Sequence, residues 1–526
     1  MAIAKIIQVI KYSQTKKNIL FYEKRPLKPA IFFTSTLILI LCLNLNFAEA
    51  SMGVLRIHPT NSRYFTDSSG KPIYFAGSHT WSVVFSVRTF PAKRAYRHPT
   101  DYNTFDNFLD FLQDYNHNFT RLWTGMSYMT AERWPWKRTG PGLAHDGRPK
   151  FDMTKFDQKY FDILKDKAQQ IENRGMYASV MIFGSHNKFK SNYEDIAWHP
   201  DNNINDMGFK DGDSFFKPTR QGLYAQRILV KKLADTLNDI DNIIFEVMNE
   251  APISKSAQWQ KDIVTYAKQY EAHKPKQHLW GITAGWHNSN PYLISGPHDW
   301  WSPDTTLVEG YDYRQGGPAS FSVKPVIADS DHFDGGLYRI TEISKGISLV
   351  WKTFTRGNHP ILMECYDDNW TGSEFGCDNE VNHVFDPIRK ALGHTRIYAN
   401  RFSDLSRTEP SESICSTKYC MVNPGEDYII YQPVSYERRR SSSLVREQSK
   451  LTKKPGIVRS DPETNSFTVF LKKGRYNLEW FDPLDESLSI DSIRIENDGR
   501  MNFTKPSHIK NDAVLYLKKT EEKADN

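Results

Sequence analysis

The first residue with clear chemical potential is a glutamate that closes an apolar run. Residues 242–252 read NIIFEVMNEAP, a β-type segment that ends in Asn249-Glu250 and then a proline. An ionisable group at the end of a buried strand costs free energy, so its presence indicates a function that keeps it there. A helix cap or an ion pair at a barrel rim is the structural alternative for a lone Asn-Glu pair. Glu250 is therefore the first catalytic candidate.

Reactive and aromatic residues follow the other strand-like runs in the same way. They supply carboxylates, imidazoles, an amide, a guanidinium and aromatic rings: His79, Trp81, Arg121, Trp123, His186, Asn249, Trp286, Tyr311, Tyr313, Asp329, Asp331, His332 and Glu364. Indole faces stack on the C–H surface of a sugar ring, and charged groups bind its hydroxyls. Each Trp alone is more often part of a core. Together these residues predict a carbohydrate-binding rim.

Strand-like runs, which must position this rim, alternate with helical patterns along the chain. Amphipathic helical patterns separate eight strand-like runs at residues 73–77, 119–123, 177–183, 242–248, 278–283, 306–311, 324–328 and 360–364. This alternation predicts a (β/α)8 TIM barrel, which carries its reactive groups at the carboxyl ends of its strands. A doubly wound sheet is the rival, but no GxGxxG or GxxxxGK[ST] phosphate loop occurs. A β-hairpin within residues 54–72 is expected to cap the barrel floor.

After a last helical stretch at residues 387–400, the sequence no longer alternates between helical and strand-like patterns. Short alternating runs at 428–434, 466–471, 476–482 and 513–517 predict an antiparallel β-sandwich. A solvated loop at 437–454 interrupts it, and a polyanion-binding patch is the alternative for this basic segment. A chain of 526 residues is long enough for more than one domain. We expect a leader at residues 1–50, a barrel at 51–401 and a sandwich at 402–526.

The leader carries most of the net positive charge of the chain. It has seven Lys or Arg against two Glu, whereas the net charge of the whole chain is +6. The remainder is nearly neutral, which argues against a nucleic acid partner. A basic start, an apolar run at 31–47 and Ala48-Glu49-Ala50 predict a cleaved signal peptide, with an N-terminal membrane anchor as the alternative. We expect a secreted, periplasmic or cell-surface protein whose mature chain has no membrane span.

Four cysteines remain after the leader, an even number in an oxidising compartment. Cys365 with Cys377, and Cys415 with Cys420, are the candidate disulfides, and four buried thiols are the alternative. Their spacing, without clustered histidines, argues against zinc.

A metal site within residues 329–334 is a weaker alternative. Its Asp-x-Asp-x-x-Asp pattern is one residue longer than the EF-hand spacing. We expect no metal and no cofactor.

Several motifs resemble a known family. Asn118-Phe-Thr-Arg121 on the second strand, Asn249-Glu250 after the fourth and a carboxylate after the seventh resemble the clan of retaining glycoside hydrolases that includes the cellulase-like family 5. Further motifs resemble secreted cellulase-family proteins, which are similar to apiosidase-like barrels: Gly77-Ser-His-Thr-Trp81, Arg138-Thr-Gly-Pro141, Phe151-Asp-Met-Thr-Lys155, Lys274-Pro-Lys-Gln-His278, Asp329-Ser-Asp-His332 and Trp351-Lys-Thr-Phe-Thr-Arg-Gly357. Cys420-Met-Val-Asn-Pro-Gly425 resembles the C-terminal domain of those barrels that is named for collagen binding.

The resemblance implies a role for each central residue. Glu250 would be the general acid/base, Asn249 would hydrogen-bond the sugar 2-hydroxyl, and Arg121 would keep the nucleophile ionised. A retaining mechanism needs one protonated and one ionised carboxyl roughly 5 Å apart. The remaining rim residues would bind substrate.

The nucleophile is the least determined role. The clan places a Glu where this chain has Ser330, flanked by Asp329 and Asp331. Strand periodicity puts both aspartates on one face, and we rank Asp331 first because it is nearer the mouth. Asp329 is second and Glu364 third. Since Asp is shorter than Glu, an inverting reaction with carboxyls roughly 6.5–9.5 Å apart stays open.

Two other functional classes compete with this prediction. A non-catalytic glycan or matrix adhesin would keep the aromatic rim and lose turnover. A serine or cysteine hydrolase is less supported, because no GxSxG occurs and the mature cysteines look structural. We expect a secreted glycoside hydrolase that acts on a plant or algal type of polysaccharide or its oligosaccharides, with loops 126–148, 186–217 and 288–304 setting its specificity.

Overall fold

The computed structural model describes most of the chain after the leader. The described residues are 53–79, 105–124, 134–184, 194, 196–207, 209, 211–283, 290–303, 322–330, 343–363, 383–433 and 465–520. They belong to one compact unit, Ala50–Asn526. The predicted leader and the insertion at 437–454 lie outside the described residues.

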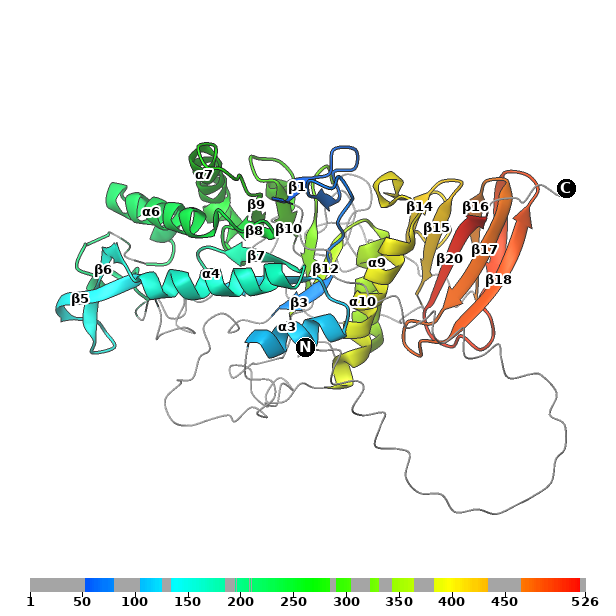
Figure 1. Cartoon of the computed structure of the whole chain (residues 1–526), viewed down its shortest axis with the longest axis horizontal. Helices are drawn as coiled ribbons and strands as arrows, with labels where there is room; N and C mark the ends of the chain where they lie inside the picture. The colour runs from blue at the N-terminus through cyan, green and yellow to red at the C-terminus, as the bar shows by residue number, and fades with distance from the viewer. Residues whose placement is uncertain are drawn as a thin grey trace, which may run out of the picture. The chain divides into compact units, whose positions relative to one another are not determined.

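Eight parallel strands form a barrel (Figure 1). They are β3 (Gly77–His79), β4 (Phe119–Trp123), β7 (Tyr177–Met181), β8 (Ile243–Glu246), β9 (Trp280–Thr283), β10 (Trp300–Ser302), β11 (Ile327–Asp329) and β12 (His359–Met363). The sheet order is β10-β9-β8-β7-β4-β3-β12-β11, and an isolated parallel bridge between Trp301 and Val326 joins its two edges. The nearly closed sheet confirms the predicted TIM barrel.

Amphipathic helices cover the outside of the barrel. They are α3 (Phe105–Asp114), α4 (Gln158–Asn173), α6 (Arg220–Leu237), α7 (Ile253–Glu271), α9 (Ile343–Thr355) and α10 (Asp386–Arg401), with the short α8 (Asn290–Leu293). Side chains cap two of them, because Asp157 accepts from the Lys159 N–H and Thr219 from the Gly222 N–H. Helices α3, α4, α6, α9 and α10 each bury apolar residues along one face.

The floor of the barrel is apolar. A two-stranded antiparallel hairpin of β1 (Arg56–Ile57) and β2 (Phe65–Thr66) places Phe65 against Phe75, with ring centroids 4.4 Å apart. Phe75 in turn stacks on Phe119, at 4.6 Å. Gly77 lets β3 approach β4, since a Cβ there would collide with the Phe119 carbonyl. The expected hairpin is therefore part of the floor.

The sixth barrel strand was placed wrongly by the sequence. Its position is taken by Trp300–Ser302 rather than by residues 306–311, which lie outside the described residues. The segment 126–148 is also more regular than the expected loop. It contains β5 (Trp136–Leu143), which pairs with β6 (Pro149–Phe156) as an antiparallel hairpin.

Two antiparallel sheets form the C-terminal sandwich, as predicted. One contains β13 (Glu409–Pro410), β14 (Cys420–Asn423), β15 (Asp427–Gln432), β20 (Ala513–Thr520), β17 (Gly474–Phe481) and β18 (Leu488–Ile495), and the other pairs β16 (Ser466–Leu471) with β19 (Gly499–Thr504). Apolar side chains from both sheets share a core. Cys415 and Cys420 form a disulfide, whereas Cys365 and Cys377 lie outside the described residues.

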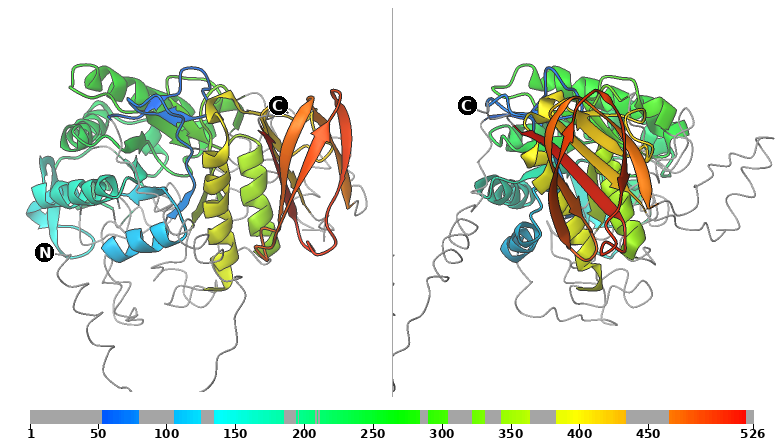
Figure 2. Two further views of the ribbon diagram at one scale, coloured as in Figure 1. Left: turned by 45° about the vertical axis from the view of Figure 1, so that its right-hand side comes forward. Right: turned by 90° about the vertical axis from the view of Figure 1, so that its right-hand side faces the viewer.

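The large sheet of the sandwich packs on α9 and α10 (Figures 1 and 2). Trp351 stacks on Tyr431, with ring centroids 6.2 Å apart and planes 13° apart. Arg401 donates from both terminal nitrogens to Glu479, at 2.6 and 2.8 Å, and the Tyr398 hydroxyl donates to the same carboxylate at 2.6 Å. Barrel helices and sandwich strands thus share one apolar core.

Within the part of the chain that the structure describes, no helix combines the length and the apolar character needed to cross a membrane.

Candidate active site

A group of charged side chains lies buried at the carboxyl end of the barrel. Arg121 of β4 is fully buried, and so are Glu246 at the end of β8 and Asp329 at the end of β11. The Arg121 Nη1 donates to the Asp329 Oδ2 at 2.5 Å, and its Nε lies 2.9 Å from the Glu246 Oε2. Closure of the barrel brings these three strands together. The guanidinium of Arg121 therefore forms ion pairs with two carboxylates, and all three groups are shielded from water.

His79 also contacts Asp329. The indole Nε1 of Trp123 can only donate, and it lies 3.1 Å from the His79 Nδ1. The Nδ1 of His79 is thus an acceptor, which leaves the ring proton on Nε2. That nitrogen lies 3.1 Å from the Asp329 Oδ2 and donates to it. Asp329 therefore accepts from Arg121 and His79 at one oxygen, an arrangement that favours the ionised carboxylate.

Glu246 is held differently from Asp329. Its Oε2 accepts from the Ser179 hydroxyl at 3.3 Å and faces Arg121, whereas its Oε1 has no hydrogen-bond partner among the described residues. Burial, opposed by Arg121 and assisted by nearby Asp329, raises the pKa of Glu246 to about 7. Glu246 is therefore a carboxyl that exchanges its proton near neutral pH.

Glu250 lies just beyond β8 in an unusual backbone conformation. Its φ of 51° is in the left-handed region, where a side chain other than Gly, Asn or Asp is uncommon. The residue is only 6% exposed. The preceding Asn249 is anchored by its N–H, which donates to the Gly184 carbonyl at 3.0 Å, and Pro252 is the N-cap residue of α7. Strained residues of this kind persist where the surrounding structure fixes them, often at functional sites.

Trp123 lies at the end of β4 and contacts His79 and Arg121. It is 7% exposed, and its ring lies near His79, with centroids 5.9 Å apart and planes 26° apart. The Arg121 guanidinium carbon is 5.8 Å from the Trp123 ring centroid. In this structure Trp123 therefore supports His79 and Arg121 from one side.

The sequence-predicted site residues fall into two groups. His79, Arg121, Trp123, Asn249, Glu250 and Asp329 are described, and each lies within a barrel strand, at its carboxyl end or a few residues after it. The other candidates lie outside the described residues: Trp81, His186, Trp286, Tyr311, Tyr313, Asp331, His332 and Glu364. In the weaker metal hypothesis Asp329 would be a ligand, but it is bound by Arg121 and His79.

Sequence reasoning missed Glu246 and Ser179. The signal for Glu246 was present, because a charge inside the apolar run IIFEVM needs a buried partner. The partner was not visible, since Arg121 lies on another strand. Ser179 carried no signal of its own.

Solved structures resemble almost the whole chain. A protein described as a glycoside hydrolase has a TM-score of 0.57 and 13% identity, covering 90% of this chain and 98% of that one. A glycoside hydrolase family 5 protein from Bacteroides vulgatus ATCC 8482 has a TM-score of 0.53 and 13% identity, covering 89% of this chain and 94% of that one. At such low identity the likeness establishes a shared fold.

The sequence comparison with protein families matches a smaller part of the chain. Residues 114–228 match the model of a domain of unknown function, DUF6298. This range includes β4 with Arg121, the β5–β6 hairpin and β7, and it ends before Glu246 and Glu250. No curated protein matches the chain.

Proposed function

We propose that the chain is a glycoside hydrolase with Glu250 as its general acid/base. The observation that carries the proposal is the placement of Glu250, nearly buried and in a left-handed conformation, at the strand end beside Asn249. The active sites of TIM-barrel enzymes lie at this end of the barrel. The fold shared with family 5 glycoside hydrolases supports the same reaction class.

Asp329 is the proposed ionised carboxylate. Arg121 and His79 both donate to it, so its negative charge is stabilised before any substrate arrives. This is the role that the family resemblance gives to the partner of Arg121. The pairing moves Asp329 ahead of Asp331, which was ranked first from the sequence and lies outside the described residues.

Glu246 would act on this pair through Arg121. When Glu246 is protonated, Arg121 and Asp329 form a neutral pair; when it is ionised, two carboxylates compete for one guanidinium. Its pKa of about 7 makes this change occur near neutral pH. We therefore assign Glu246 as a positioning residue whose ionisation weakens the hold of Arg121 on Asp329.

The substrate class is a polysaccharide or oligosaccharide, as the sequence predicts, and plant and algal types are tested first. The secreted location, the signal peptide and a binding role for the sandwich belong to the same proposal. A collagen-binding role for the sandwich rests on the sequence resemblance alone.

A second candidate function follows from the burial of Asp329. A carboxylate with 0% exposure that is tied to two donors also suits a structural ion pair. The barrel would then bind a glycan without cleaving it, as an adhesin does.

One experiment separates the two functions. Hydrolysis of a panel of polysaccharides and aryl glycosides is measured for the wild type, Glu250→Gln, Asp329→Asn and Asp331→Asn, with NMR following the anomeric configuration of the product. Turnover that disappears in Glu250→Gln and Asp329→Asn supports the enzyme. Retained configuration makes Asp329 the nucleophile, and inversion makes it the base. A wild type that binds a glycan without cleaving it supports the adhesin.

A further inference from the structure

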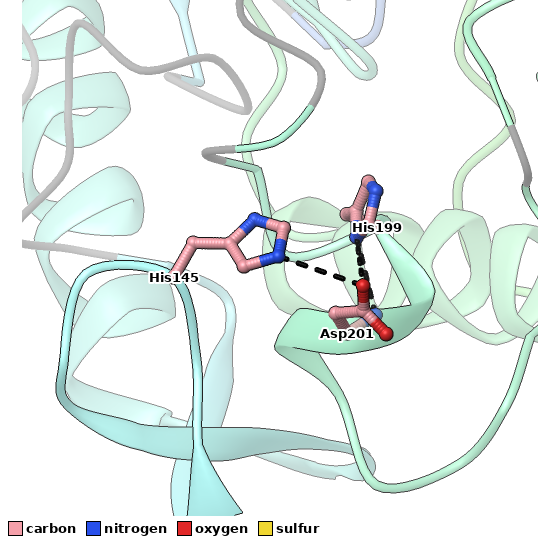
Figure 3. Close-up of side chains that lie close together, drawn as sticks. All are labelled: His145, His199 and Asp201. Atoms are coloured by element: carbon pink, nitrogen blue, oxygen red, sulfur yellow. Dashed lines mark hydrogen bonds and ion pairs between the residues drawn. The ribbon is translucent and has the colours of Figure 1, made fainter.

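A second group of ligating side chains lies away from the buried charges of the barrel. His145 is in the turn between β5 and β6, and His199 and Asp201 belong to the segment that forms the 3-10 helix η3 (Pro200–Asn202) (Figure 3). One ligating atom from each of the three residues lies within 4.8 Å of the other two. The group joins the connection after β4 to the connection after β7.

The tautomer of His145 follows from its backbone contact. Its Nδ1 lies 2.6 Å from the Glu194 carbonyl oxygen, which can only accept, so Nδ1 carries a proton. In a neutral ring, the Nε2 then has a lone pair. This Nε2 lies 3.5 Å from the Asp201 Oδ2 (Figure 3).

His199 also turns an unprotonated nitrogen to this carboxylate. Its Nδ1 accepts from the Asp201 backbone N–H at 3.1 Å and therefore holds no proton. It lies 3.9 Å from the Asp201 Oδ2. The capping bond from the Asp201 N–H uses the lone pair of Nδ1, so a cation bound at this nitrogen would replace that bond.

The spacing of these three donor atoms can be compared with the geometry of a zinc site. Zn²⁺ bonds of about 2.0–2.1 Å in a tetrahedron place neighbouring donor atoms roughly 3.4 Å apart. The observed separations of 3.5 and 3.9 Å from Asp201 to the imidazoles are close to that value.

Neighbouring groups hold the donors in place. The Asn202 Oδ1 accepts from the His145 backbone N–H at 2.8 Å, and its Nδ2 donates to the Glu194 carbonyl at 2.6 Å and the Ile196 carbonyl at 2.9 Å. The same Glu194 carbonyl orients the His145 ring. Carbonyl contacts of this kind orient histidine ligands in metal sites.

We propose that His145, His199 and Asp201 bind a Zn²⁺ ion that ties the β5–β6 hairpin to residues 196–203. Two imidazole nitrogens and one carboxylate oxygen suit zinc, whereas Ca²⁺ and Mg²⁺ take oxygen ligands. Water would complete the coordination at this exposed position. The site needs no glycosidase activity, so it stands or falls independently of the proposed function.

The test is metal binding to the full chain after treatment with a chelator. Zn²⁺ is added to the wild type, and binding is measured by competition with a chromophoric chelator and by calorimetry. We expect one Zn²⁺ per chain and a rise in the melting temperature that depends on Zn²⁺ concentration. The spectrum of bound Co²⁺ reports the coordination directly.

Three variants test the ligands without removing local support. His199→Asn keeps a side chain that can cap η3, Asp201→Asn keeps the shape, and His145→Ala leaves the backbone bond to Asn202. His145→Ala and His199→Asn should each weaken Zn²⁺ binding at least about tenfold, with a smaller loss in Asp201→Asn. His273→Ala, which removes an exposed histidine elsewhere, is the matched control and should bind as the wild type does.

Two results would overturn the site. Zn²⁺ binding that is equal in the wild type and His145→Ala places the ion elsewhere in the chain. An absence of binding, together with NMR signals showing His145 as an imidazolium at neutral pH, makes the group a proton-mediated ion pair with Asp201.

Discussion

The two ends of the barrel stabilise their buried polar side chains in different ways. At the floor, the buried imidazole of His359 is satisfied by the backbone, since Phe75 N–H donates to its Nδ1 and its Nε2 donates to the Arg63 carbonyl. At the mouth, Arg121 is shared by two carboxylates, and Glu246 keeps one oxygen without a described partner. The polar group of the floor is therefore paired with backbone, whereas the mouth gathers buried charged side chains around one guanidinium.

The largest expected effect belongs to Glu250. Glu250→Gln should lower turnover by about 10²–10⁴-fold, because the amide cannot donate a proton to the leaving group. The loss should shrink on dinitrophenyl glycosides, whose leaving group needs no protonation. The measurement is kcat/KM on substrates with leaving groups of graded acidity.

A floor variant is the control for that experiment. Phe75→Leu should lower the melting temperature and leave kcat/KM unchanged, since Phe75 packs against residues of the floor. A similar loss of turnover in both variants would remove the distinction between the two ends.

Arg121→Met should be the most destabilising change at the mouth. It leaves Asp329 and Glu246 buried without their cation, at a cost of about 3–5 kcal/mol in the free energy of unfolding. Denaturant titration measures the loss. The double variant Arg121→Met/Asp329→Asn removes one orphaned charge and should recover part of it; an additive further loss would contradict the shared-guanidinium description.

The mouth and the floor of the barrel should change the free energy of unfolding with pH in opposite directions. The folded pKa of Glu246 is raised from 4.5 to about 7, so its stabilising contribution is complete below pH 4.5 and is lost as the pH rises to about 7. The slope within that window is about 1.4 kcal/mol per pH unit at most. The difference in unfolding free energy between the wild type and Glu246→Gln, measured from pH 4.5 to 7, isolates this term.

The buried histidine of the floor changes the free energy of unfolding with pH in the opposite direction. Burial lowers the pKa of His359 from 6.5 to about 4, so its contribution is present above pH 6.5 and is lost as the pH falls through about 4. Glu246→Gln should leave this acid limb intact. A flat difference between wild type and Glu246→Gln across pH 4.5–7 would show that Glu246 ionises normally in the folded protein.

The smallest expected effect concerns the backbone at Glu250. Glu250→Gly and Glu250→Ala both remove the carboxyl, but only glycine accepts a φ of 51° without strain. Glu250→Gly should therefore be more stable than Glu250→Ala by about 1 kcal/mol. Thermal unfolding of the pair measures this difference. Equal stabilities would mean that the left-handed conformation carries no strain.

Local pattern was sufficient for much of the fold. Residues 119–123 form a strand with the predicted bounds, because apolar and β-branched residues stand between helical and turn segments. Trp300–Ser302 escaped detection, since a three-residue strand within ISGPHDWWSPD is too short to show a period among turn residues.

Long-range partners were the part that local pattern could not supply. Glu250 was visible because it closely follows a predicted strand. Arg121 and Asp329 are 208 residues apart, and only the closure of the barrel makes them neighbours. His145 and Asp201 likewise meet because two separate connections converge.

The packing of α9 and α10 on the sandwich has a consequence for how this architecture diverges. Trp351 and Tyr398 are barrel residues whose apolar partners, Tyr431 and Phe481, belong to the sandwich. A barrel of this lineage that lost its C-terminal part would present those rings to water. Descendants without the sandwich should therefore carry polar residues at these two helix positions, a trace readable from their sequences alone.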